Sequence, residues 1–261
     1  MTRPVPYVIL ESMLIQRVAF LSDFHYPYES KEAIGLTLDL LGELNPNVVI
    51  FGGDVVDFYP ISSFLRDPAR RAQLQSDLDH AAAGVMRFRK ALPKARFLFK
   101  EGNHCLRLQK YLWSTAPELA GLRALKLPEL LRFDRAGVER FIKNRDRYHI
   151  GRLYYLHGNE FRLGTVHPAR AMLLRTHVNS LFGHVHKFDH FSVKDLAGNS
   201  HASWSNGCLC DLLPEYDVMP NWTNGFTYVD YVDDGLFSVE PVRFFSHRGR
   251  LKVIQGGELK G

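Results

Sequence analysis

Cysteine is scarce in this 261-residue sequence, which contains only three, an odd number. That count excludes a disulfide framework, and we expect a reducing compartment, the cytoplasm. No apolar run is long enough to span a bilayer, so we expect no membrane partner. The apolar stretch at 5–15 is interrupted by Pro6, Glu11 and Ser12, and we expect no signal peptide there. Internal repeats and low-complexity linkers are also missing.

Hydrophobic residues make up 46% of the chain, which is enough to form the core of one large domain. Charge is spread unevenly along the chain. Residues 87–152 hold 17 Lys and Arg against 6 Asp and Glu, a balance of +11, whereas the remainder holds 16 against 22, a balance of −6. This basic segment indicates either an anionic partner such as DNA or RNA, or only a solvated helical face.

Strand-like and helix-like segments alternate in the first half of the chain. Short β-prone runs occur at 18–21, 48–51, 96–99 and 153–156. Helical patterns occur at 31–44, 61–92, 106–148 and 168–174. The second half predicts antiparallel strands at 188–193, 200–205, 226–232, 236–239 and 242–245. We therefore predict an α/β fold of mixed sheets covered by helices, in a single domain at 1–261 with a basic helical insertion at about 105–150.

Metal-type or acid–base residues follow a short apolar strand five times. The five motifs are Asp23-x-His25, Gly53-Asp54-x-x-Asp57, Gly102-Asn103-His104, His157-Gly158 and Gly183-His184-x-His186. Sites in α/β sheets form beyond the carboxyl ends of the strands, so these loops can converge. Asp, His and Asn ligands without thiolate suit Mn, Fe, Zn or Ni. The set exceeds what one ion needs, and two ions that share a bridging carboxylate would use it.

The order and spacing of these motifs resemble the calcineurin-like metallophosphoesterase superfamily. The match runs from Asp23 to His186, and Ser205-Asn-Gly207 resembles the strand entry that often follows. Two departures stand out, because Cys105 replaces an acidic residue and Phe58 replaces the arginine of the protein Ser/Thr phosphatases. The segment 206–216 looks like phage-type members, so the resemblance implies a bacterial or phage-infected host cell. It also implies two mixed β-sheets packed as a sandwich and flanked by helices in four layers.

The resemblance also implies roles for single residues. One ion would be bound by Asp23, His25, Asp54 and His186. The other would be bound by Asp54, Asn103, His157 and His184, so that Asp54 bridges the two. His104 would be the general acid, and Asp57 would orient its ring. The metals would supply a hydroxide near neutral pH that attacks the phosphoester in line.

Several other residues have two interpretations. Cys208-x-Cys210 suits a structural zinc, but buried inert cysteines are the commoner case. Tyr26 follows the first metal motif and either stacks on a base or packs in the core, and we count it as a candidate substrate-binding residue. Arg107 lies in the basic segment just after His104, and we expect it to contact substrate. The seven histidines outside the motifs are taken as ordinary.

The leading hypothesis is two-metal hydrolysis of phosphodiesters in nucleic acid or nucleotides, with Mn favoured. The nuclease and cyclic-nucleotide diesterase branches of the superfamily share the five motifs, so the motifs do not choose between them. A phosphomonoesterase of broad specificity is the second hypothesis. A binding protein that keeps the fold without the chemistry is a more distant one. The sequence leaves the metal and the oligomeric state open.

Overall fold

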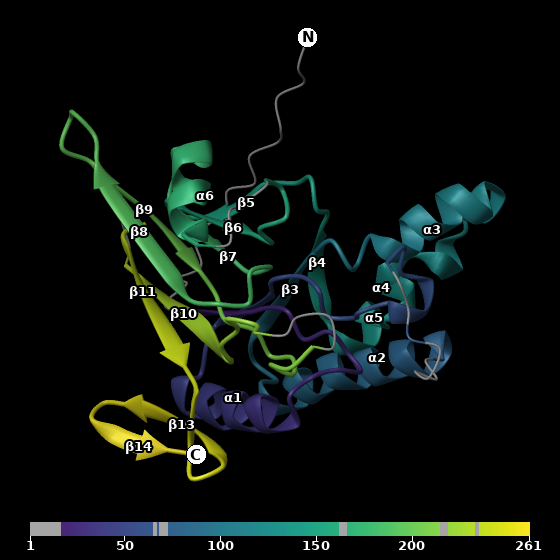
Figure 1. The fold of residues 1–261 in the computed structure, drawn as a ribbon, viewed down its shortest axis with the longest axis horizontal. Coiled ribbons are helices and arrows are strands. Elements are labelled where there is room, and N and C mark those ends of the chain that lie inside the picture. The colour runs from purple at the N-terminus through teal and green to yellow at the C-terminus, as the bar shows by residue number, and fades with distance from the viewer. Residues whose placement is uncertain (1–16, 65–66, 68–72, 162–165, 215–218, 233–234) are drawn as a thin grey trace.

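Two large β-sheets form the centre of the computed structural model, which describes residues 17–64, 67, 73–161, 166–214, 219–232 and 235–261 (Figure 1). The first sheet has six strands in the order β11-β10-β1-β2-β3-β4. Their bounds are β1 Arg17–Leu21, β2 Val48–Phe51, β3 Arg96–Lys100, β4 Val138–Ile142, β10 Gly225–Tyr231 and β11 Phe237–Arg243. Strands β1 to β4 run parallel to one another, whereas β10 and β11 pair antiparallel.

The second sheet has five strands in the order β5-β6-β7-β9-β8. Their bounds are β5 Tyr148–Ile150, β6 Leu153–Leu156, β7 Ser180–Phe182, β8 Asp189–Lys194 and β9 Ser200–Ser205. The neighbours β6, β7 and β9 are parallel, and the two edge strands pair antiparallel. Both sheets are therefore mixed, as the family resemblance implied.

The two sheets pack face to face. In β1, Val18 and Phe20 point into the apolar layer that also holds Tyr155 and Leu181 of the second sheet. The alternate residue Leu21 belongs to the layer beneath the helices, because successive side chains of a strand point to opposite faces. Residues on both faces of β1 and β2 are buried, which explains their nearly continuous hydrophobic sequences.

Helices cover the outer faces of both sheets. Helices α1 (Lys31–Leu44) and α2 (Leu74–Ala91) lie on the first sheet, and α6 (Pro168–Thr176) lies on the second (Figure 1). The side chain of Ser30 accepts a hydrogen bond from the Ala33 N–H and so begins α1. The predicted four-layer α/β sandwich is confirmed. No helix in the described ranges is long and apolar enough to cross a membrane.

The basic segment after β3 differs from its prediction. Helices and turns occupy only its first part, with α3 Arg107–Thr115, η2 Pro117–Leu119, η3 Arg123–Leu125, α4 Leu127–Leu130 and α5 Phe133–Ala136. The helical prediction for 106–148 is wrong beyond Ala136, because Val138–Ile142 instead extends the first sheet beside β3. The next strand, β5, belongs to the second sheet. Residues 107–136, called the helical arm below, lie at one side of the molecule, and α3 projects from it whereas α4 and α5 pack near α2 (Figure 1).

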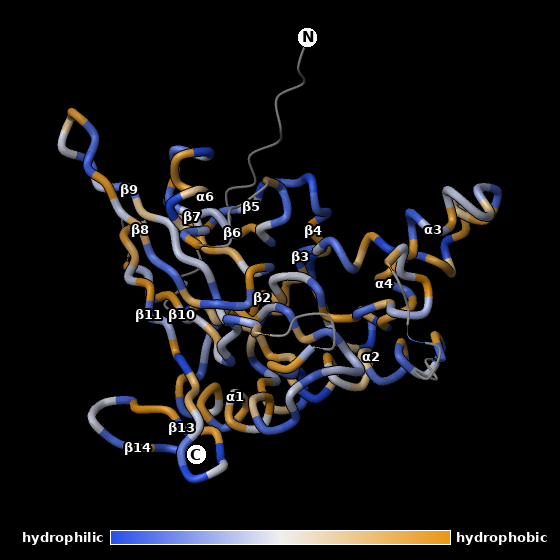
Figure 2. The backbone as a smooth tube through the Cα atoms, in the orientation of Figure 1, coloured by the Kyte–Doolittle hydropathy of each residue, from blue (hydrophilic) through white to orange (hydrophobic). Residues whose placement is uncertain are grey.

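Two further differences concern the predicted helix at 61–92 and the C-terminus. The structure has the turn η1 (Tyr59–Ile61) and then α2 from Leu74, and 65–66 and 68–72 lie outside the described residues. The two strands predicted at 236–239 and 242–245 are one strand, β11. A small sheet of β12 (Phe245–His247), β13 (Arg250–Gln255) and β14 (Glu258–Lys260) follows and packs near α1. Figure 2 shows both hydrophobic and hydrophilic residues in this small sheet.

Candidate metal centre

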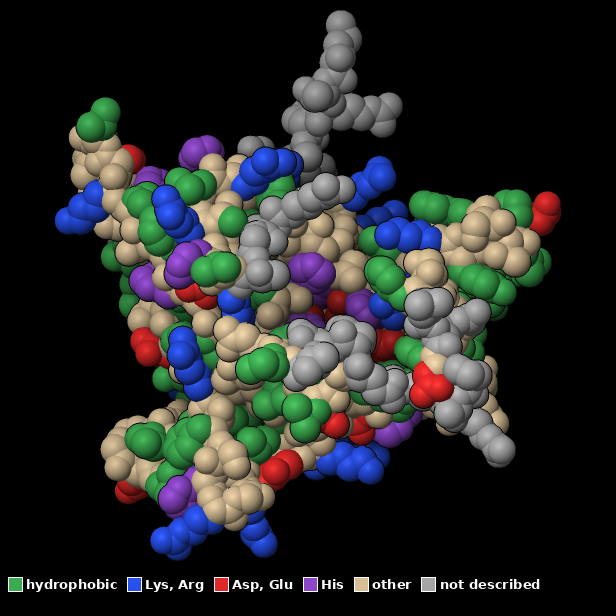
Figure 3. Space-filling view, in the orientation of Figure 1, with side chains coloured by type: hydrophobic (Ala, Val, Ile, Leu, Met, Phe, Trp, Pro, Cys, Tyr) green, Lys and Arg blue, Asp and Glu red, His purple; other side chains and the backbone are tan. Residues whose placement is uncertain are grey.

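All five sequence motifs lie at one edge of the sandwich. Three of them follow β1, β2 and β3 of the first sheet, and two follow β6 and β7 of the second. Because these strands run parallel within each sheet, their carboxyl ends lie together. The space-filling view shows histidine and acidic side chains gathered in a hollow near the centre of one face (Figure 3).

A first group of potential ligands consists of Asp23, His25 and His186. One ligand atom from each lies within 4.8 Å of the others, and all three side chains are buried. His186 Nε2 is 3.2 Å from His25 Nε2 and 3.3 Å from Asp23 Oδ1. Among the described residues, nothing donates a hydrogen bond to Asp23 Oδ1, although the atom is buried. A buried carboxylate oxygen without a donor, facing two imidazole nitrogens, suits a cation.

A second group consists of Asp54, His157 and His184, whose ligand atoms also lie within 4.8 Å of one another. His157 Nε2 is 3.0 Å from Asp54 Oδ2 and 3.0 Å from Asn103 Oδ1. The other ring nitrogen, Nδ1, lies 2.8 Å from the Gly52 carbonyl oxygen. Because a carbonyl only accepts, Nδ1 carries a proton, and Nε2 is the nitrogen that faces the group.

The charged groups of the centre shift one another's pKa values. Burial alone would raise the pKa of Asp54, but the His157 charge holds it well below its ordinary value. Burial opposes protonation of His157, yet the Asp54 carboxylate raises its pKa to about 9. Burial and the His157 charge lower the pKa of His184 to about 4. The proton on His157 Nε2 thus stands among acceptor oxygens, where a metal ion would also be stabilised.

Backbone conformation at the motifs is unusual. Five of their residues that are not glycine have a positive φ, between 50° and 70°: Asp23, His25, Asp54, His184 and His186. Such conformations cost free energy and cluster at functional sites. Glycines permit the loops to approach, since a Cβ on Gly102 would lie 2.2 Å from Asp54 Oδ1. A Cβ on Gly183 would lie 2.6 Å from Asp23 Oδ2, so both motif glycines are sterically required.

A third cluster, formed by Asp57, His104 and Arg107, lies beside the first group. Asp57 Oδ2 is 2.9 Å from His25 Nδ1 and 3.1 Å from His104 Nδ1. Arg107 donates from Nη1 to Asp57 Oδ1 at 3.1 Å and to the Asp57 carbonyl at 2.9 Å. Its Nη2 lies 3.1 Å from His104 Nε2. Burial alone would raise the pKa of Asp57, but its hydrogen bonds to His104 and His25 hold it far below the ordinary range.

Tyr26 does not take the position expected of a substrate contact. Only 3% of its surface is exposed, and its ring stacks on Phe24 with centroids 5.7 Å apart. A Cβ on Gly84 of α2 would lie 2.5 Å from the Tyr26 hydroxyl, so the ring fills a space left by that glycine. Tyr26 therefore packs in the core, and the prediction that it contacts substrate is corrected.

Three other residues lie at the centre, although the sequence motifs did not indicate them as part of the site. Glu160 accepts hydrogen bonds from the backbone N–H groups of His157, at 3.1 Å, and Gly158, at 2.6 Å. The Trp222 ring packs edge-on against His186, with centroids 4.2 Å apart. Cys210 Sγ lies 4.0 Å from His186 Nδ1. A sequence signal existed only for the cysteine, since neither Glu160 nor Trp222 belongs to a motif.

The profile of calcineurin-like phosphoesterases matches residues 16–218. The chain belongs to this family. The described fold, two mixed sheets flanked by helices, agrees with this family. No curated protein matches the chain.

Three solved structures are similar to this family member. Vps29 from Chaetomium thermophilum is 12% identical at a TM-score of 0.50, with 95% of this chain and 96% of that chain covered. Vps29 from Entamoeba histolytica is 14% identical at a TM-score of 0.43, with 94% of this chain and 96% of that chain covered. The phosphoesterase Yfce from E. coli is 14% identical at a TM-score of 0.39, with 82% of this chain and 88% of that chain covered. At these identities the likeness concerns the fold alone.

Proposed function

We propose that this protein is a two-metal-dependent phosphoesterase that hydrolyses phosphodiesters. The observation that carries the proposal is the convergence of two ligand groups, one around Asp23 and one around Asp54, with His104 beside them. Asp23 Oδ1, which has no hydrogen-bond donor among the described residues, supports the binding of a cation there. Family membership supports the same class of reaction.

The first ion would be held by Asp23, His25 and His186, and the second by Asn103, His157 and His184. Asp54 would contact both. Divalent ions bound there supply a water of lowered pKa and neutralise charge that develops on the phosphoryl oxygens. Oxygen and imidazole donors in both groups favour a borderline or hard ion, and we propose Mn.

The protein's own groups would then orient the substrate and move a proton. Asp57 fixes the His104 ring, since Nδ1 donates to its carbonyl or carboxylate oxygen, and Nε2 is left to contact other groups. His104 would give a proton from Nε2 to the leaving oxygen. A guanidinium only donates, so the Arg107 contact to Nε2 shows the ring with a free lone pair there. We propose that a bound phosphoryl group draws Arg107 onto its oxygens and frees Nε2, which then takes up a proton from solvent before giving it to the leaving oxygen.

The basic segment 87–152 supports a polyanionic substrate, DNA or RNA, over a small phosphomonoester. Part of that charge is already engaged, since Arg89 donates to backbone carbonyls of residues 93, 95, 136 and 137. Arg132 pairs with Asp79 on α2. The side chains of Lys110, Arg123 and Lys126 are exposed on the helical arm, although Lys126 Nζ also donates to the Ala120 carbonyl at 2.8 Å. These three are our candidates for contacts to phosphates away from the cleaved bond.

One substrate screen tests this proposal. Purified protein with added Mn is assayed on p-nitrophenyl phosphate, bis-p-nitrophenyl phosphate, cyclic nucleotides, and single- and double-stranded DNA. We expect turnover of the diesters to exceed that of the monoester. Faster turnover of the monoester would contradict the diester assignment. Turnover of none of them by Mn-loaded protein would favour a binding protein on the same fold.

A further inference from the structure

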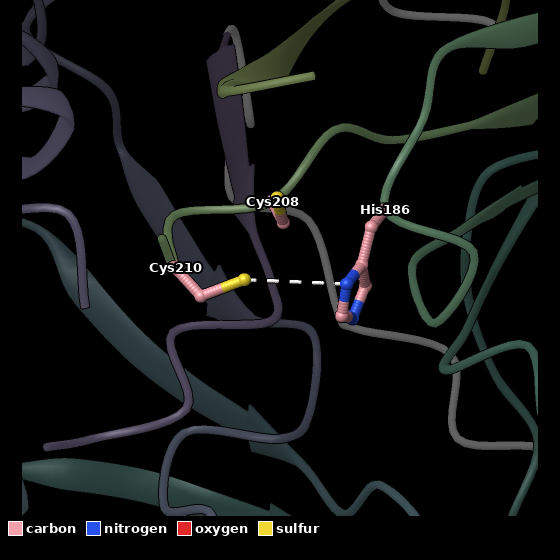
Figure 4. A group of neighbouring side chains, drawn as sticks. All are labelled: His186, Cys208 and Cys210. Carbon is pink, nitrogen blue, oxygen red and sulfur yellow. Dashed lines mark hydrogen bonds between the residues drawn. The ribbon is translucent and has the colours of Figure 1, made fainter. Parts of the chain in front are cut away.

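Two cysteines lie directly behind one of the candidate metal ligands. Cys208 and Cys210 belong to the loop after β9, and 0% and 3% of their surfaces are exposed. Both sulfur atoms and a ring nitrogen of His186 lie within 4.8 Å of one another. Figure 4 shows the Cys210 sulfur pointing at the ring, with Cys210 Sγ 4.0 Å from His186 Nδ1. The ring therefore has the Asp23 group on its Nε2 side and sulfur on its Nδ1 side.

Hydrogen bonds to the backbone of this loop hold the two cysteines in place. Asn224 Nδ2 donates to the carbonyl oxygens of Cys208, at 3.2 Å, and Cys210, at 2.8 Å. Between them, the Leu209 N–H donates to the Asp23 carbonyl at 3.1 Å, and the Leu209 side chain is buried in the main core. The loop is thus fixed on both sides of the cysteine pair. Little reorganisation is needed for both sulfurs to bind one ion.

We propose that Cys208 Sγ, Cys210 Sγ and His186 Nδ1 form a separate site for a soft metal ion of the Cu(I), Zn(II) or Cd(II) class. Two thiolates and an imidazole are the donor set that selects such ions over Mn or Mg. Binding would release the thiol protons to solvent, because thiolate is the ligating form. The two oxygen-rich groups contain no sulfur, so the sites differ in the ions that they prefer.

Sharing His186 couples the soft-metal site to the first ligand group. A neutral imidazole has one nitrogen lone pair, because its other nitrogen carries a proton. The ring therefore cannot ligate through Nε2 and Nδ1 at once while it is neutral. A soft ion at the cysteines would take His186 from the ion beside Asp23. This step alone rests on the proposed function, because it takes His186 as a ligand of the first ion.

The first experiment tests the soft-metal site without any activity assay. The reduced full-length protein is titrated with Cd(II), and the sulfur-to-cadmium charge-transfer absorption is recorded in the ultraviolet. We expect the band to saturate at about one equivalent per chain and to be lost in both Cys208→Ser and Cys210→Ser. Cys105→Ser is the matched control, because Cys105 is buried away from the cluster, and it should keep the band. No band in the wild-type protein, or a band unchanged in either cluster variant, would overturn the proposal.

The second experiment tests the coupling. Protein loaded with Mn is given one equivalent of Cd(II), desalted and analysed for both metals. We expect the wild-type protein to lose more Mn than Cys210→Ser does at the same Cd(II) concentration. Equal losses would overturn the sharing of His186. A protein that holds no Mn from the start would refute the proposed function instead, and the charge-transfer band would still decide the soft-metal site.

Discussion

The backbone N–H of His104 donates a hydrogen bond to Asp54 Oδ1 at 2.8 Å. This bond joins the loop after β3 to the loop after β2 and occupies one oxygen of the carboxylate. The other oxygen, Oδ2, lies 3.0 Å from His157 Nε2, which follows β6 of the second sheet. Asp54 thus connects both sheets at the edge where the motifs meet, which supports the proposal that it is the shared ligand.

His104→Ala should keep both metals and lose rate. We expect kcat to fall roughly 10²- to 10⁴-fold on a diester with a poor leaving group, as is usual when a general acid is removed. The loss should be much smaller with p-nitrophenol as leaving group, because p-nitrophenolate needs no proton. His247→Ala, an exposed histidine on β12, is the control. Equal losses on both substrates would show that His104 is not the acid.

Arg107→Gln should weaken substrate binding more than turnover. Loss of charge-assisted hydrogen bonds to a phosphoryl group should raise KM by roughly 10- to 100-fold. Lys110→Gln changes an exposed charge on the same helix and should leave KM for bis-p-nitrophenyl phosphate nearly unchanged. If KM for this small substrate changed equally in the two variants, Arg107 would contribute only to the overall positive charge and would not contact the phosphoryl group.

Metal binding should release a proton from His157. Burial lowers its pKa, but the Asp54 charge raises it to about 9 in the metal-free protein. The ring is therefore protonated near neutral pH and must lose a proton to ligate, whereas His184, whose pKa burial lowers to about 4, is already neutral. Calorimetric titration with Mn in buffers of different ionisation enthalpy measures the release. It should be largest below the His157 pKa and fall as pH rises through it; release that does not change with pH would contradict this account.

The helical arm should confer salt-dependent binding to DNA. Each phosphate contact made by Lys110, Arg123 or Lys126 should contribute about −0.9 to the log–log slope of duplex affinity against salt. Replacing all three with Gln should flatten the slope and leave turnover of bis-p-nitrophenyl phosphate unchanged, because this substrate is too small to reach them. A control triple with equal charge loss uses Arg248, Arg250 and Lys252 near the C-terminus. The same slope in wild-type protein and the arm variant would leave the arm as an ordinary solvated surface.

The sequence indicated which side chains would lie close together, because these residues occupy contiguous motifs. Each motif follows directly on a strand, so the topology of a parallel sheet brings the motifs together without further information. Tyr26 was misassigned because its fate depends on Gly84, 58 positions later, which leaves room for its ring. The position of Cys210 behind His186 was not foreseen either, since it depends on Asn224 holding the loop.

The fold could be predicted to the level of layers but not of every element. The four buried strands of the first half have strong hydrophobic signals, and they were placed within a residue or so. Strand β4 was missed because its sequence, Val-Glu-Arg-Phe-Ile, carries two charges and follows a helical segment. It is a strand because it adds to the open edge of β3, and this tertiary pairing overrides local preference.

The metal content of purified protein is the most direct test of a two-metal centre in which Asp54 is the shared ligand. Purified wild-type protein, Asp23→Asn, Asp54→Asn and the exposed control Asp39→Asn are equilibrated with Mn, desalted and analysed by mass spectrometry. We expect about two ions per chain in the wild-type and control proteins, about one in Asp23→Asn and almost none in Asp54→Asn. Full occupancy in Asp54→Asn, or no bound Mn in the wild-type protein, would contradict a two-metal centre bridged by Asp54.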